Sequence, residues 1–245
     1  MFGWGVEEAE RYTDRLEVEL NLHYPERRWE VMTFAAPGYN LVMELEVLRH
    51  HALAYQPDLI LYGFVANDAC LPNFVSTRLR IASATSFVAR YVQGLVESPL
   101  QLVARNEVLG PEVEGVRPWV RYCTPSSVPP AYRDLVGWSR FQGALEELVE
   151  MGAERGVPVV FVSHLGSGEV PALKALKDLI LVSVELGPAD RLGTSEDAAG
   201  GPARRVVARG DPHPSAAGHD LIAGEIFRAL EAQGVWQRLA GLPQR

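Results

Sequence analysis

Three scarcities limit what this 245-residue chain can be. Its two cysteines, Cys70 and Cys123, are too few for a disulfide framework or for a cysteine-rich metal site. It lacks a run of about 18 apolar residues, so no part of it predicts a membrane-spanning helix. Its 23 Lys and Arg are outnumbered by 31 Asp and Glu, and the formal net charge of −8 opposes affinity for phosphate backbones. We therefore expect no nucleic-acid partner and no visible membrane segment.

Hydrophobic residues, by contrast, are abundant. They make up 47% of the chain, which at this length is enough to bury a full core in one large α/β domain. No internal repeat is evident. We therefore expect a single domain over residues 1–245.

Helical and strand-like patterns alternate along this domain. Apolar residues at helical spacing predict helices over residues 7–22, 40–55, 87–97, 139–155 and 172–177. Short continuous apolar runs predict strands over residues 29–34, 58–65, 157–162 and, as the last strand, 179–185. This alternation predicts an α/β fold with a parallel sheet that helices cover on both faces.

One connection is far longer than the usual loop between a strand and a helix. Residues 71–133 follow the predicted strand 58–65 and are rich in aromatic side chains. The segment is either a lid or substrate wall that decides which ligand fits, or a set of extra helices packed for stability.

The segment GDPHPSAAGH at residues 210–219 carries the strongest functional signal. Prolines on both sides of His213 have fixed φ angles and push the preceding residues toward extended backbone. Ser215 is placed to cap a following helix. That helix is predicted from the apolar residues Leu221, Ile222, Ile226, Phe227 and Leu230. His213 is thus expected at a rigid helix entrance.

Asp211 gives His213 a chemical partner. Its carboxylate can accept a hydrogen bond from one ring nitrogen, which fixes the tautomer and leaves the other nitrogen to take a proton from a nucleophile. The alternative is an ordinary structural turn, because Asp-Pro and His-Pro are common turn dipeptides.

Two loops upstream supply hydrogen-bond donors. The predicted strand 58–65 ends at the polar pair Asn67 and Asp68, and active-site residues collect where strands of an open α/β sheet end. Gly38, in a proline-glycine turn after the predicted strand 29–34, can bring its backbone N–H close to a ligand. A backbone N–H and the Asn67 amide aimed at one point would form an oxyanion hole.

These blocks, in this order, resemble the SGNH hydrolases, also called the GDSL esterase and lipase family. The resemblance implies that Gly38 and Asn67 are oxyanion donors, that Asp211 is the orienting acid and that His213 is the general base. It also implies a flavodoxin-like, three-layer α/β/α sandwich with a mostly parallel sheet. The Asn-Asp pair matches the family block, although its glycine, Gly63, lies further away than usual. The last block is D-x-H, where many members have D-x-x-H.

The family's nucleophilic serine has no counterpart at the start of the chain. Residues 1–6, MFGWGV, resemble the part of the family pattern G-D-S-x-x-F-G-x-G-V that follows the serine. The serine and the central first strand that carries it would then precede Met1, through a truncated start or natural loss. The chain as printed is expected to be inactive. A signal peptide or anchor would be lost with that segment, so the compartment stays open. The oligomeric state also stays open.

Within the chain, Ser163 is the best alternative nucleophile, since His164 follows it, but its flanks favour a plain strand end. The function implied is hydrolysis of a carboxylic ester, of a small molecule or a glycan, through an acyl-enzyme intermediate with no metal or organic cofactor. The alternatives are an O-acyltransferase acting on a glycan and a non-catalytic, ligand-binding relic of the fold.

Overall fold

A computed structural model describes residues 3, 5–71, 123–163, 176, 178–184, 206–208 and 211–242 of the chain. They fall into two compact units. Unit 1 comprises Met1–Pro37, Ala52–Val65 and Val149–Arg245, and unit 2 comprises Gly38–His51 and Ala66–Leu148.

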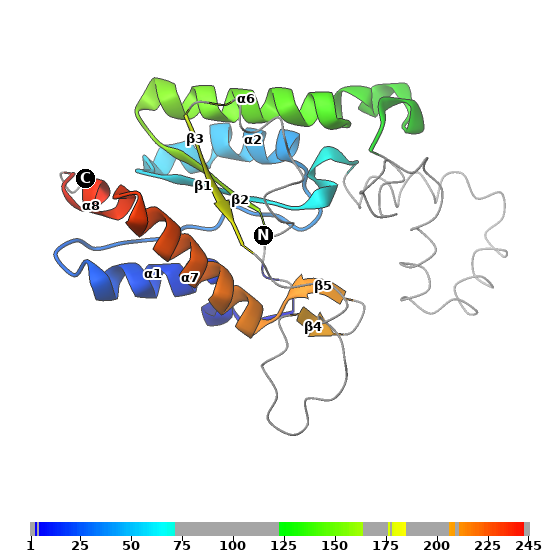
Figure 1. The fold of residues 1–245 in the computed structure, drawn as a ribbon. Helices are drawn as coiled ribbons and strands as arrows, with labels where there is room; N and C mark the ends of the chain where they lie inside the picture. Colours follow the sequence, from blue (N-terminus) through cyan, green and yellow to red (C-terminus); the bar gives the residue numbers. More distant parts are fainter. Residues whose placement is uncertain are drawn as a thin grey trace. The chain divides into compact units, whose positions relative to one another are not determined.

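Unit 1 contains a three-stranded, all-parallel sheet (Figure 1). Its strands are β1 (Ile60–Phe64), β2 (Val159–Ser163) and β3 (Leu179–Ser183), in the order β1-β2-β3. Every residue of β2 is buried, as a continuous apolar run predicts for a strand with a neighbour on each side. The predicted strands 58–65, 157–162 and 179–185 are confirmed, and the chain is a mixed α/β protein.

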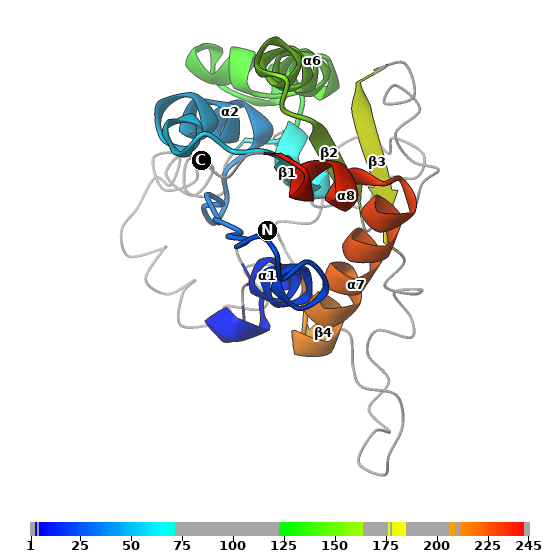
Figure 2. The same cartoon turned by 90° about the vertical axis from the view of Figure 1, so that its left-hand side faces the viewer.

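Helices α1 (Tyr12–His23) and α7 (Ala216–Ala232) lie side by side in both views of the ribbon (Figures 1 and 2). Together with α8 (Val235–Ala240) they pack against one face of the sheet. The shared core contains alternate residues of β2, because side chains of a strand point to opposite faces in turn. Its members include Leu16, Leu20, Val160, Val162, Val182, Ile222, Ile226 and Leu230.

The last turns of α6 (Trp138–Arg155) contact the sheet through a glycine. A Cβ atom added to Gly152 would lie 2.6 Å from the Val157 carbonyl oxygen and 2.6 Å from Val159 Cγ2. Val159 neighbours Val160 in β2, so its side chain belongs to the opposite face. Gly156, with φ of +66°, ends the helix as predicted.

The two N-terminal helix predictions are confirmed, each with a break. Residues 7–22 form the short 3₁₀ helix η1 (Glu8–Glu10) and then α1, because Arg11 between them is extended. Residues 40–55 form α2 (Leu41–His50) and then η2 (Ala52–Tyr55). The predicted helix 87–97 and most of 172–177 lie outside the described residues.

The strand prediction for residues 29–34 is wrong, since the segment has no regular secondary structure. Side chains of α1 take up its backbone groups instead. The Asn21 amide accepts from Trp29 N–H (3.0 Å) and donates to Trp29 C=O (2.9 Å). Glu17 accepts from Val31 N–H (2.7 Å). The apolar pattern does mark buried residues, because Trp29 and Val31 pack into the core, but a strand also needs a partner strand.

The strand predicted at residues 179–185 exists as β3, but it is not the last strand of the chain as the sequence predicted. Two short strands follow, β4 (Val206–Ala208) and β5 (Asp211–Pro214), paired antiparallel with Ala208 opposite Asp211. Their three and four residues are too few to give a periodic pattern, and the two prolines of β5 argue against a strand unless it is short.

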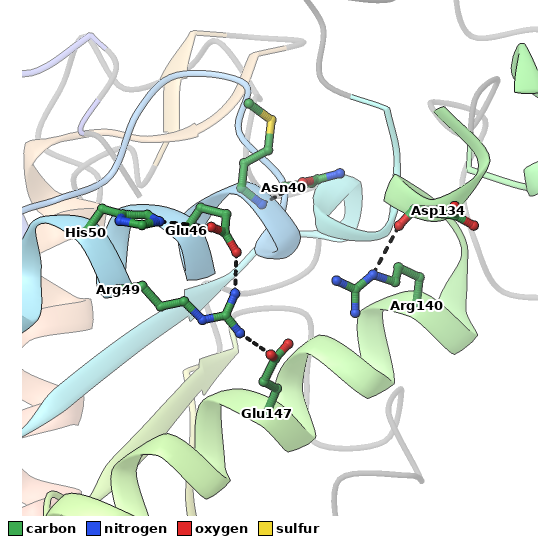
Figure 3. Close-up of polar contacts among 8 residues, drawn as sticks. Asn40, Glu46, Arg49, His50, Asp134, Arg140 and Glu147 are labelled. Carbon is green, nitrogen blue, oxygen red and sulfur yellow. Dashed lines mark hydrogen bonds and ion pairs between the residues drawn. The ribbon is translucent and has the colours of Figure 1, made fainter. Parts of the chain in front are cut away.

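Unit 2 contains α2, the N-terminal part of α6 and the 3₁₀ helices η3 (Ala66–Ala69), η4 (Pro125–Ser127) and η5 (Pro130–Leu135). Arg49 of α2 forms ion pairs with Glu46 of the same helix and with Glu147 of α6 (Figure 3). A disulfide joins Cys70 to Cys123. Most of the predicted lid, residues 72–122, lies outside the described residues. Among those described, no helix is long and apolar enough to cross a membrane.

Arg27 is a buried cation in unit 1, only 8% exposed. Its guanidinium forms an ion pair with Asp58 and donates to the carbonyl oxygens of Leu239 (2.6 Å) and Leu242 (3.3 Å). It also lies over the Trp29 ring, 5.4 Å from the centroid. One side chain thus holds the irregular segment, the approach to β1 and the end of α8.

We expect Arg27→Ala to destabilise the protein by about 3 kcal/mol, because it leaves the partly buried Asp58 carboxylate without its cation and removes the hydrogen bonds to the carbonyls of Leu239 and Leu242. Its neighbour provides the control. The Arg28 side chain is 82% exposed, and among the described residues its ion-pair partner is Glu30, so Arg28→Ala should stay within about 0.5 kcal/mol of the parent. Urea unfolding of the three proteins measures both values, and equal losses for the two variants would contradict the role given to Arg27.

Candidate functional site

His213 lies in β5, and its side chain is exposed. Two residues later the Ser215 hydroxyl accepts a hydrogen bond from Gly218 N–H (3.3 Å) and caps α7. The predicted apolar residues anchor this helix, with Ile222, Ile226, Phe227 and Leu230 buried. The structure therefore confirms an extended, proline-flanked histidine at the entrance of a capped helix.

Asp211 is the first residue of β5 and pairs with Ala208. The structure describes its backbone but not its side chain. The hydrogen bond between the Asp211 carboxylate and the His213 imidazole therefore stays a prediction.

Gly38 has φ of +76°, in the left-handed region that glycine enters without strain. It lies in the predicted turn, and Asn40 follows as the N-cap of α2. The Asn40 side-chain oxygen accepts from Met43 N–H (3.1 Å), as Figure 3 shows. The glycine turn and the helix start at residue 40 agree with the sequence prediction.

Asn67 lies in η3, which begins two residues after β1 ends at Phe64. The polar pair therefore follows a parallel strand at its carboxyl end, as predicted. Asp68 is buried, whereas the Asn67 side chain lies outside what the structure describes. The loop that carries them is tied to the Gly38 loop, because Asn40 Nδ2 donates to the Cys70 carbonyl (3.0 Å).

The four predicted site residues divide between the units. Gly38 and Asn67 belong to unit 2, where one side chain links their loops, and Asp211 and His213 belong to unit 1, where they share one strand. Each pair therefore lies within one unit. The convergence of the two pairs on one crevice stays a prediction.

Ser163 is a plain strand end, as its flanks predict. It is 7% exposed, pairs with Ser183 in β3, and its carbonyl accepts from Val184 N–H (2.7 Å). A buried hydroxyl at this position is a poor nucleophile for an external ester. Its neighbour His164 lies outside the described residues, and those described include no group of three or more His, Cys, Asp or Glu that could hold a metal ion.

His219 is a buried histidine that joins two helices. Its side chain is 1% exposed, and its Nδ1 accepts from Tyr12 N–H (3.2 Å) at the start of α1. The two rings stack at 5.9 Å. Nε2 has no hydrogen-bond partner in the part of the chain that the structure describes. Burial lowers the pKa of His219 to about 4, and the Arg11 guanidinium adds to the lowering.

The sequence analysis did not identify this role of His219. A signal was present, because residue 219 lies three before Ile222 and seven before Ile226, on the buried face of the predicted helix. Asn40 and the Cys70–Cys123 disulfide were also missed, since neither has a local pattern that names its distant partner.

Acid should weaken the α1–α7 contact through His219. His219 takes up a proton near pH 6.5 in the unfolded chain but only near pH 4 in the folded chain. The contribution of neutral His219 to stability is therefore complete above pH 6.5 and is lost as the pH falls toward 4. The loss should total about 3 kcal/mol.

His219→Gln keeps an acceptor for Tyr12 N–H without a titrating group. Urea unfolding from pH 7 to pH 4 should show a shallower decline for this variant than for the parent and for His50→Gln. Identical declines would disprove the assignment.

Comparison of the sequence with protein-family models, with curated proteins and with solved structures finds no significant match. Any assignment of function therefore depends on the residues of the site and on the motifs that they form.

Proposed function

We propose that this chain is the greater part of an SGNH-type hydrolase that cleaves carboxylic esters through an acyl-enzyme intermediate. The observation that carries the proposal is His213, an exposed imidazole held in an extended, proline-flanked strand just before a capped helix. Such a base keeps its position while protons move, which general acid–base catalysis requires.

Two features of the backbone support the roles given to its neighbours. Asp211 and His213 are two apart in β5, and positions two apart in a strand lie on the same face. Gly3 and Gly5, in the block that resembles the pattern after the serine, have φ of +86° and +79°. A glycine-dependent turn at this point agrees with the family pattern F-G-x-G-V.

In the proposed reaction a serine hydroxyl, supplied by residues upstream of Met1, attacks the ester carbonyl carbon. His213 takes the hydroxyl proton and delivers it to the departing alkoxide, which leaves as the alcohol. The Gly38 N–H and the Asn67 amide stabilise the negative oxygen of the tetrahedral intermediate. Water, deprotonated by His213, then releases the carboxylic acid and restores the serine.

The proposed function also implies a more complete fold than the described sheet. We infer the three-layer α/β/α arrangement of this family, with α1, α7 and α8 on one face of the sheet and the last turns of α6 on the other. An additional central strand would stand between β1 and the irregular residues 29–34. It would give that segment the strand partner that its apolar pattern calls for.

The genomic DNA upstream of Met1 provides the first test. An in-frame G-D-S block directly upstream is the expected result, and the protein extended to include it should hydrolyse short-chain aryl esters. The chain as printed should be no faster than its own His213→Ala variant. A stop codon directly upstream would instead favour the ligand-binding relic.

In the extended protein, His213→Ala should lower kcat by a factor of about 10⁴ or more, because members of a catalytic triad act as a unit. His50→Ala is the control, since His50 is an exposed residue of α2 that pairs with Glu46, and it should leave kcat unchanged. Turnover that survives His213→Ala would contradict the proposal. Product analysis with a glycan as acceptor separates a hydrolase, which releases free acid, from an O-acyltransferase.

A further inference from the structure

Asn40 is an unusually placed asparagine in unit 2. It is 1% exposed and lies two residues after Gly38, while Cys70 lies three residues after Asn67. Its side chain uses its hydrogen-bonding capacity on three separate segments. The oxygen accepts from Met43 N–H (3.1 Å), and Nδ2 donates to the carbonyls of Cys70 (3.0 Å) and Leu135 (2.8 Å).

We propose that Asn40 is the positioning residue of the oxyanion hole, which fixes the loop that carries Gly38 relative to the loop that carries Asn67. This inference depends on the proposed function. Its bond to the Cys70 carbonyl joins the loop that carries Asn67 directly to the N-cap of α2. An asparagine is suited to the task, because one planar amide can cap a helix with its oxygen and bind two carbonyls with its NH₂ group.

The other attachments of the Asn67 loop make it stiff around this link. Gly137 N–H donates to the Ala69 carbonyl (2.8 Å), and the disulfide to Cys123 fixes Cys70. The carbonyl of Ala69, the last residue of η3, and that of Cys70, which follows it, therefore both accept hydrogen bonds. Neither of these two attachments reaches the start of α2, where Gly38 lies, whereas the bond from Asn40 does.

The chemistry predicts which kinetic constant depends on Asn40. Oxyanion donors bind charge that develops only in the transition state, so a shift between the two donors should lower kcat and leave KM nearly unchanged. A misplacement of about 1 Å costs a factor of about 100 in rate. A purely structural asparagine would lower thermal stability without this selective loss of kcat.

The test compares Asn40→Ser with a matched variant, Asn21→Asp. Serine keeps an N-cap acceptor for α2 but is too short to bind both carbonyls. Asn21 also bridges segments with its side chain, to Glu17 and Trp29, but in unit 1 and away from the site residues. Both variants should lower the Tm. In the extended, serine-containing protein only Asn40→Ser should lower kcat, by about 10- to 100-fold at constant KM.

Amide hydrogen exchange on the printed chain makes the inference independent of catalysis. Asn40→Ser should accelerate exchange in both loops, at residues 38–43 and 66–71, while Asn21→Asp should affect residues 29–31. If the extended parent protein does not hydrolyse esters, the proposed function fails, and the exchange measurement alone decides the link. Exchange that changes only in α2, or an unchanged kcat in Asn40→Ser, would overturn the role of Asn40.

Discussion

The rest of unit 1 depends on the complete burial of β2. This strand pairs on both edges, with β1 and with β3, and all five of its residues are buried. One face contributes to the core shared with α1 and α7, and Val159 on the other face meets Gly152 of α6. A strand so enclosed tolerates no shift of register, because a one-residue slip would exchange its two faces. It therefore fixes where β1 ends, and hence where the loop with Asn67 begins.

The residues of the proposed site lie where regular structure stops. The Asn67 loop starts after β1, the Gly38 loop ends at the N-cap of α2, and His213 precedes the N-cap of α7. A glycine and the Asn40 cap limit the backbone around Gly38, and two prolines and the Ser215 cap do so around His213. The scaffold thus supplies rigidity, and the ends of its elements supply the groups with chemistry.

The elements that the sequence predicted are those in which local pattern and burial agree. The continuous apolar runs of β1, β2 and β3, the periodic apolar residues of α1, α6 and α7, and the cap Ser215 all follow this rule. Residues 29–34 have the pattern of a strand, but pairing is a property of two segments, and here the side chains of Glu17 and Asn21 take the backbone groups. The short strands β4 and β5 carry no period at all.

The candidate site shows the same division. Motif reading found His213, Asp211, Gly38 and Asn67, each beside a turn or strand end visible in the sequence. It did not find Asn40 or His219 as connectors, because their partners are 30 and 207 residues away. The fold sets the partners of such long-range hydrogen bonds, and the local sequence does not identify them.

The central claim is that Gly38, Asn67, Asp211 and His213 form one esterase site with an upstream serine. A crystal structure of the extended protein, after reaction with a phosphonate that labels active serines, tests it most directly. We expect the phosphonyl oxygen to accept hydrogen bonds from Gly38 N–H and Asn67 Nδ2 at about 2.7–3.1 Å. We also expect His213 Nε2 within hydrogen-bond reach of the serine oxygen. A phosphonylated serine with His213 at the opposite end of the sheet, or a label on another residue, would contradict it.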